Sequence, residues 1–271
     1  MTQQTLSMSV AQFEAYVVRA LNAAIAKRDL ASARLALQQG LEKVPGSRVL
    51  RDWAFLLNPA WQDTVQAKNV RLRPPNASDA DYVFGCFTDQ AFMRLYNPAR
   101  LATPPSREQI AKALANASFS LVNSRSTDWI IEKRATIPGS SQPIFEPVGL
   151  ANLTNIVAGH RRAEYLMGIL SPEDRGAGIA ITTSLLIFDL VFNRLGCHKL
   201  SVVVMKDNRL SQDTCLSLGF VEEGVRRSHV LHPLDGNWID CCDSAMLESD
   251  FRGNSRLARL SRRLLGRDVT G

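Results

Sequence analysis

Residues 163–180, AEYLMGILSPEDRGAGIA, constrain the fold of this chain more than any other stretch. An apolar segment over Tyr165–Leu170 predicts a β-strand, and residues 175–180 open a long helix after a Ser-Pro-Glu-Asp turn. The first amides of a helix have no intrahelical partner and lie at the positive end of its dipole, so they attract phosphate groups. Gly176 and Gly178 carry no side chain that would hold a phosphate away. The stretch therefore predicts a phosphate-binding turn.

The spacing of the glycines narrows the kind of phosphate site. A dinucleotide fingerprint needs a third glycine and an acidic residue about 20 positions on, and a P-loop needs Lys-Ser or Lys-Thr, so neither pattern fits. What remains, Arg-x-x-Gly-x-Ala over residues 175–180, resembles the acyl-CoA pyrophosphate loop of the GNAT acetyltransferase superfamily. A plain strand-to-helix turn is the alternative interpretation of this loop.

From about Ser9 to Leu57 the sequence carries a helical pattern. Phe13, Val17 and Leu21 recur at helical spacing, and a second period follows over residues 30–41. Residues 27–57 resemble a single tetratricopeptide-type unit, and fewer than about three such repeats rarely stand alone. Two interpretations stay open: a helical hairpin that docks on the next domain, or a unit that binds a protein partner or a second copy of the chain.

Length and charge suggest three parts. A chain of 271 residues with 45% apolar content can bury one large or two smaller domains, and the polar, proline-marked segment 58–69 is the best boundary. We expect a helical domain over residues 1–65, a catalytic domain over 66–251 and a basic tail over 252–271. The tail holds six arginines and one aspartate, so it carries +5 of the total charge of +6. Its pattern predicts a short basic amphipathic helix that touches an anionic membrane or nucleic acid, packs on its own or a neighbouring subunit, or is solvated.

The middle of the chain alternates strands and helices. Predicted strands cover residues 70–74, 129–132, 147–155, 199–205, 221–232 and 238–247, and predicted helices cover 80–89, 107–117 and 207–219. The β-branched run over Lys199–Met205 is typical of a strand buried on both faces. Antiparallel strands followed by one strand-helix-strand crossover predict an α+β fold with a mixed, mostly antiparallel sheet.

A second group of motifs strengthens the family resemblance. Asn208-x-x-Ser211 is followed by Gly219-Phe220, then by an E-G-x-x-R element at residues 223–227 and a G-x-W-x-D element at 236–240. This order resembles GNAT N-acetyltransferases of the RimJ/RimL-like type. The resemblance covers residues 70–247 and implies the GNAT fold, acetyl-CoA as co-substrate and transfer of an acetyl group to a primary amine.

The resemblance also implies which residues bind coenzyme A. The pantetheine arm would lie between two separating strands and pair with the backbone of Ile169 and Leu170. The helix that begins at Asn208 would hydrogen-bond the same arm through Asn208 and Ser211. The pyrophosphate would lie on the backbone amides of the loop, with charge added by the arginine side chain; the loop residues are Arg175, Gly176, Ala177, Gly178, Ile179 and Ala180.

Acyl transfer to an amine needs a base for the ammonium and a proton for the departing thiolate. We assign the base to Glu164, whose distance from Arg175 resembles that of the catalytic glutamate in histone-acetylating relatives; an ordinary strand carboxylate is the alternative. We assign the acid to Ser211, which could instead cap its helix or contact the cofactor. Many GNAT enzymes carry a tyrosine acid where this chain has Cys215, so this thiol is a further candidate acid or a buried bystander.

The sequence says less about the acceptor, the metal content and the cellular location of the protein. The acceptor is a protein N-terminal amine or a small-molecule amine, and the alternative to an enzyme is a non-catalytic CoA-binding adaptor whose helical domain docks a partner protein.

The five cysteines lack metal-ligand or disulfide spacing and predict free thiols, so we expect no metal. No signal-peptide pattern and no apolar run of about 18 residues is visible, which favours the cytoplasm. The nearly neutral body gives no strong nucleic-acid or membrane signal.

Overall fold

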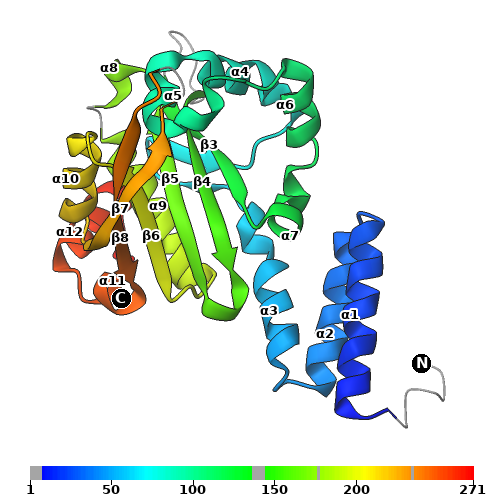
Figure 1. The fold of residues 1–271 in the computed structure, drawn as a ribbon. Coiled ribbons are helices and arrows are strands. Elements are labelled where there is room, and N and C mark those ends of the chain that lie inside the picture. The colour runs from blue at the N-terminus through cyan, green and yellow to red at the C-terminus, as the bar shows by residue number, and fades with distance from the viewer. Residues whose placement is uncertain (1–7, 136–143, 176–177, 233–234) are drawn as a thin grey trace.

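An eight-stranded mixed sheet organises the computed structural model, which describes residues 8–135, 144–175, 178–232 and 235–271 (Figure 1). The strand order is β1-β2-β3-β4-β5-β6-β8-β7, and all neighbours pair antiparallel except the parallel pair β5 and β6. The strands are β1 (Val65–Gln66), β2 (Val70–Arg73), β3 (Thr127–Ala135), β4 (Ile144–Val157), β5 (Arg162–Ile169), β6 (Lys199–Met205), β7 (Val221–Leu231) and β8 (Trp238–Leu247). The predicted α+β class is confirmed.

Helices flank the sheet on both faces and precede it in the chain. They are α1 (Val10–Ala26), α2 (Leu30–Lys43), α3 (Arg48–Leu56), α4 (Ala80–Thr88), α5 (Gln90–Tyr96), α6 (Arg107–Leu114), α7 (Ser120–Ser124), α8 (Pro172–Arg175), α9 (Ile179–Phe188), α10 (Arg209–Ser217), α11 (Glu248–Arg252) and α12 (Ser255–Leu265). Figure 1 shows α4, α5 and α6 gathered at one end of the sheet and α1 to α3 projecting beside it. Within the described ranges, no helix has the length and apolar character needed to cross a bilayer.

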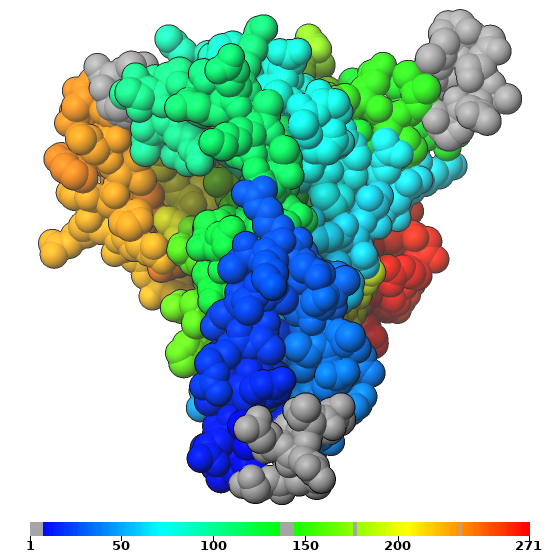
Figure 2. All heavy atoms as spheres, turned by 90° about the vertical axis from the view of Figure 1, so that its right-hand side faces the viewer, coloured from blue at the N-terminus to red at the C-terminus, as the bar shows by residue number. Residues whose placement is uncertain are grey.

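The N-terminal helices form their own small core and dock on the sheet domain. Helices α1, α2 and α3 bury Val17, Leu21, Leu37 and Leu50 together, as the helical spacing predicts. The predicted helical extension is therefore confirmed. In the space-filling view the blue atoms of this unit lie against green atoms of the sheet domain (Figure 2).

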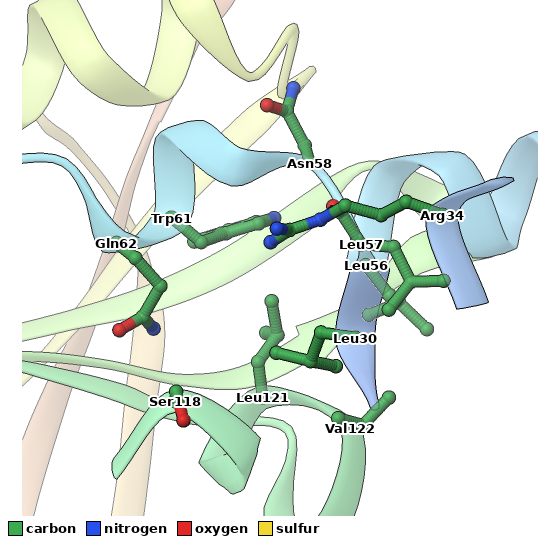
Figure 3. Close-up of a pocket in the computed structure, with 10 residues that line it drawn as sticks. All are labelled: Leu30, Arg34, Leu56, Leu57, Asn58, Trp61, Gln62, Ser118, Leu121 and Val122. Atoms are coloured by element: carbon green, nitrogen blue, oxygen red, sulfur yellow. The ribbon is translucent and has the colours of Figure 1, made fainter. Parts of the chain in front are cut away.

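A small cavity of about 10 Å³ marks the junction between the helical unit and the sheet domain, enough for about one water (Figure 3). Arg34 of α2 points its guanidinium toward Trp61 there and donates from Nε to the Leu57 carbonyl at 2.9 Å. Trp61 is 1% exposed and belongs to the core of the sheet domain. The junction is thus tightly packed.

The sheet carries a different hydrophobic cluster on each face. One face packs on α9, with Trp129, Tyr165 and Leu200 among the buried residues. On the other face, Ile130 and Leu150 pack under the end of the sheet covered by α4, α5 and α6. Alternate residues of each strand therefore face two separate cores, as the pleat requires.

Strands β5 and β6 pair over only three residues before they separate. Their parallel register joins Arg162 to Lys199, Ala163 to Leu200 and Glu164 to Ser201, and no further pair follows, although both strands continue. Beyond Glu164 the edge of β5 that faces β6 is therefore unpaired. The predicted separation of these two strands is confirmed.

Two sequence expectations about neighbouring elements are wrong. Strand β6 is buried on one face only. Ser201 and Val203 on its other face stay half-buried, because α4–α6 do not extend over them. The helix predicted to start at Arg175 is interrupted: α8 ends at that residue, α9 begins at Ile179, and after Phe188 the chain continues as a π-helix, η7 (Asp189–Arg194).

The basic C-terminal segment packs on its own domain. Helix α12 contacts α9, and Leu257 and Val269 are buried in the α9-side core. Arg267 donates to the buried Asp189 carboxylate at 2.5 Å, which fixes the end of the chain next to η7. The alternative of a helix packed on its own domain is the one that the structure shows.

A buried charge network ties β2 to β3 and to the turn before α4. Arg73 donates two hydrogen bonds of 2.7 Å to Asp79 and one of 2.8 Å to Glu132, whose residue is 2% exposed. Arg71 donates to the same glutamate from a more exposed position. Although burial alone would raise the pKa of Asp79, the bonds from Arg73 and the Asn76 amide bring it below its usual value.

We expect Arg73→Met to lower the free energy of unfolding by about 3–5 kcal/mol, because buried Asp79 loses its arginine partner and Glu132 keeps only the more exposed Arg71. Arg71→Met, the matched control, should cost about 1 kcal/mol, because Glu132 keeps Arg73. Urea unfolding at pH 7 measures both. The lowered pKa of Asp79 stabilises the fold above the unfolded pKa of about 4, so the difference between wild type and Arg73→Met should shrink as the pH falls below 4. Equal losses in the two variants would contradict the network's role.

Candidate active site

The turn before α9 has the geometry of an anion site. Gly178 caps the helix with φ +73°, a left-handed conformation that glycine adopts without strain, and its carbonyl accepts from the Thr182 amide at 3.0 Å. By helix geometry the amides of Ile179 and Ala180 have no partner within α9 and point out of its N-terminus. A Cβ placed on Gly178 would meet no atom within 4 Å, so the space in front of this turn is open. Two further loop residues of the predicted site, Gly176 and Ala177, lie outside the described residues.

Arg175 closes the turn onto β5. Its guanidinium donates from Nε to the Ile169 carbonyl at 3.2 Å and from a terminal nitrogen to the Leu170 carbonyl at 3.1 Å. In this conformation the side chain shapes the loop through backbone contacts. Its expected contribution of charge to a pyrophosphate stays a prediction.

The two backbone positions predicted to bind the pantetheine arm differ in orientation. The Leu170 amide donates to Val148 on β4 at 2.9 Å, so it faces away from the gap between β5 and β6. Backbone groups alternate along a strand, so Ile169 faces the gap, where its carbonyl accepts from Arg175 Nε. Of the pair, Ile169 is the position whose backbone a ligand in the gap can reach.

Helix α10 borders the gap on the β6 side. Asn208 caps it, with its side-chain oxygen accepting from the Ser211 amide at 3.3 Å, so its amide nitrogen is left to meet a ligand. Within the described ranges the Ser211 hydroxyl makes no hydrogen bond. Cys215, one turn further on, packs against the α9-side core, and burial raises the pKa of its thiol to about 11. The helix is capped by Asn208, so the alternative capping role for Ser211 is wrong, while the acid roles of Ser211 and Cys215 stay predictions.

Glu164 lies on the opposite face of the sheet, at the last residue pair before β5 and β6 separate. The Asn155 amide donates to its carboxylate at 3.1 Å, and the side chain is half-buried. Asn155 itself adopts a left-handed backbone with φ +49° at a β4 irregularity, which turns its side chain toward β5. Glu164 and α10 thus approach the same gap from different faces.

Gly168, which had no role in the sequence prediction, determines how closely α5 approaches the gap. A Cβ on this residue would lie 2.6 Å from Phe92 and 2.9 Å from Tyr96, whose rings stack at 4.9 Å. The short helix α5 falls in the least patterned part of the sequence. The signal that could have located this contact is the glycine itself, because it interrupts the face of the apolar strand that also carries Leu166.

A parallel strand pair that opens, an open helix N-terminus beside it and a capped second helix define a site for an extended nucleotide thioester. Residues 69–221, more than half of the chain, match the family described as acetyltransferase (GNAT) domain. The chain therefore belongs to this family of acetyl-CoA-dependent N-acetyltransferases and is an acyltransferase. The predicted family membership and co-substrate are confirmed.

Curated relatives agree with this assignment. The uncharacterized N-acetyltransferase YoaA of Bacillus subtilis is 29% identical over 176 residues, which cover 64% of this chain and 93% of that protein. The ribosomal protein uS5-alanine N-acetyltransferase of Escherichia coli is 27% identical over 113 residues, which cover 40% of this chain and 57% of that protein.

Solved structures show the same fold. RimJ of Mycobacterium smegmatis in complex with CoA-disulfide is similar over 77% of this chain and 97% of its own, with a TM-score of 0.60 and 23% identity. The spermidine N-acetyltransferase of Vibrio cholerae in complex with CoA and spermine is similar over 67% of this chain and 96% of its own, with a TM-score of 0.55 and 23% identity. The predicted RimJ/RimL-like type agrees with this likeness.

The described residues include no group of three or more His, Cys, Asp or Glu side chains that could hold a metal ion. All five cysteines are free thiols, four of them buried and Cys215 half-buried, as the sequence predicts. Burial raises the pKa of Cys197 to about 12 and that of Cys86 to about 11. These thiols therefore stay protonated at neutral pH.

We expect Gly178→Ala to weaken coenzyme A binding by at least tenfold, because its methyl group enters the open space at the α9 N-terminus. Gly196→Ala is the matched control: its φ is +67°, its Cβ also meets no atom within 4 Å, and it lies after η7. Both substitutions should cost about 1–2 kcal/mol of stability through the left-handed backbone. Calorimetric titration with coenzyme A and thermal unfolding separate the two effects, and equal affinity in both variants would exclude Gly178 from the site.

Proposed function

We propose that this protein transfers the acetyl group of acetyl-CoA to a primary amine, with the α-amine of a protein N-terminus as the favoured acceptor. The observation that carries the proposal is the gap between β5 and β6 beyond the Glu164–Ser201 pair. The ribosomal protein uS5-alanine N-acetyltransferase relative supports a protein acceptor. A small-molecule amine remains the other acceptor class.

The residues around the gap fit coenzyme A. The open amides of α9 would hold the pyrophosphate, Ile169 would pair with the pantetheine arm along the free edge of β5, and Asn208 would bond the same arm. Acetyl-CoA supplies the acetyl thioester that reacts. The chain's own groups then bind, orient and move protons.

Base and acid lie on different faces of the sheet. Glu164 faces the side that α4–α6 only partly cover, so an amine that arrives there can give its proton to the carboxylate. Ser211 lies in the first turn of α10, which packs beside β6, where a hydroxyl can donate to the departing thiolate. This arrangement lets the acceptor and the leaving group use separate entrances to one gap.

We expect Glu164→Gln to lower kcat with an N-terminal peptide by about 10²–10³ at pH 7, with little change in the KM for acetyl-CoA. A free α-amine has a pKa near 8, so the loss should shrink above that pH, where the amine needs no base. Thiol release over a panel of peptides and small amines measures this, with Glu222→Gln on the exposed β7 strand as control. Unchanged turnover in Glu164→Gln would remove the base assignment. Tight acetyl-CoA binding without turnover on any amine would favour the adaptor.

We expect Ser211→Ala to lower kcat by about tenfold or more and Cys215→Ala to lower it far less. The serine hydroxyl has no competing hydrogen bond in the described part of the chain, whereas the thiol packs into the core. Because burial raises the Cys215 pKa to about 11, its protonation does not change between pH 6 and 9, and neither does its predicted contribution. Ser217→Ala, at the far end of α10, serves as control in the same assay. A larger loss in Cys215→Ala would transfer the acid role to the thiol.

A further inference from the structure

Three arginines form a row on the outer face of α12 that the proposed reaction does not use. Arg256, Arg259 and Arg263 follow the spacing i, i+3 and i+7, so they lie within about 60° of one another around the helix. All three side chains are exposed. Figure 1 shows α12 on the flank of the sheet domain away from α1 to α3, so the helical unit does not cover this α12 arginine row.

The protein does not neutralise the charge of the α12 arginine row. The other arginines in exposed or half-buried positions of α11, α12 and the segment after them have carboxylate partners; these pairs are Arg252–Glu248, Arg262–Asp268 and Arg267–Asp189. Among the described residues, by contrast, the three arginines of the row form no ion pair and no side-chain hydrogen bond. Helix α12, SRLARLSRRLL, itself contains no acidic residue. Three positive charges on one face are therefore available to an external anion.

Folding stability does not account for the row. Arg256 lies in the first turn of α12, at the positive end of the helix dipole, where a cation is unfavourable. Arg259 lies three residues after Arg256 and four before Arg263, and like charges at these spacings repel one another. Only Arg263, in the last turn, is at the end of the helix where the dipole favours a cation. The arrangement lowers the stability of α12, so its benefit has to come from binding.

The buried face of α12 argues against a membrane as the partner. An amphipathic helix binds a bilayer by burying its apolar face between the lipids. Leu257 is 0% exposed, and Leu260 and Leu264 pack against the same α9-side core. The apolar face is thus already occupied by the protein, and only the charged face is free.

A protein partner fits this face less well than a nucleic acid. The centre of a protein interface is apolar, whereas every leucine of α12 is buried or half-buried. A nucleic-acid duplex carries one negative charge for about every 1.7 Å of its axis. The row extends about 10 Å along the helix, so it can face several phosphates at once. The planar guanidinium group of arginine also matches the geometry of phosphate oxygens.

The α12 arginine row lies away from the coenzyme A site. At the start of α12, the Asn254 side chain donates to the Leu218 carbonyl at the C-terminal end of α10. After α12, the Val269 carbonyl accepts from Asn193 of η7 at 2.8 Å. These contacts lie at the ends of α10 and of α9–η7 that are opposite to the ends bordering the gap between β5 and β6. The phosphates of a bound coenzyme A are therefore not the partner of the row.

We propose that the α12 arginine row binds the phosphate backbone of a nucleic acid without reading its sequence. RNA and DNA share this chemistry, and the choice of probe separates them. The helix lies outside residues 69–221, which match the acetyltransferase family, so this surface is an addition to the catalytic domain. Its role would be to hold the enzyme close to a nucleic-acid-containing assembly.

The test measures binding of the full chain to short duplexes of DNA and RNA and to a single-stranded RNA of the same length, as the salt concentration rises from about 50 to about 200 mM. Wild type should bind at least one probe, with an affinity that falls linearly on logarithmic axes. The triple variant Arg256→Gln/Arg259→Gln/Arg263→Gln should bind at least tenfold more weakly at the lowest salt, and its salt slope should be smaller by about 2–3. Its affinity for coenzyme A should not change, and its thermal stability should equal or exceed that of wild type.

The matched control removes the same total charge from other exposed positions, Arg19 of α1, Arg48 of α3 and Arg227 of β7, each replaced by glutamine. This control should keep the affinity and salt slope of wild type. An equal loss in both triple variants would reduce the effect to net charge and overturn the proposal. Absence of binding to all three probes at the lowest salt would overturn it as well. Phosphatidylserine vesicles or polyglutamate bound more tightly than any nucleic acid, through the same three arginines, would replace the proposed partner with a membrane or an acidic protein.

Discussion

The early separation of β5 from β6 is the constraint on which the rest of the site depends. A parallel pair that continued beyond Glu164 and Ser201 would use the backbone groups of both strands, and no extended ligand could lie between them. Because the pairing stops after three residues, one edge of β5 is left for another partner. Helix α8 contacts both β5 and α9, which brings the N-terminus of α9 toward that edge, and α10 contacts β6. Glu164 and Tyr165 point to opposite faces of the sheet, because successive side chains alternate along a pleated strand.

The sequence was sufficient for much of this architecture, and its limits have physical causes. The strands predicted over residues 199–205 and 238–247 have the bounds that the structure shows for β6 and β8, Lys199–Met205 and Trp238–Leu247. The glycine-rich turn indicated a helix N-terminus in this region, but the predicted start at Arg175 lies four residues before α9 begins at Ile179. Gly168 escaped prediction because its importance comes from contact with Phe92 and Tyr96 on α5, a helix far earlier in the chain. Burial of β6 was overestimated for a related reason: local pattern does not reveal where a covering helix stops.

The closed end of the gap gives the N-terminal helical unit a structural connection to the site. The carbonyl of Arg161, just before β5, accepts a hydrogen bond from the His198 amide at 2.7 Å. This bond joins the start of β6 to the start of β5. Its side chain donates to the Arg51 carbonyl of α3 at 3.1 Å and lies 4.6 Å from the centre of the Phe55 ring. One residue therefore links the point from which the two strands diverge to the helical unit. Since strand separation depends on a fixed origin, packing of α3 at this point restrains the geometry of the gap from outside the acetyltransferase fold.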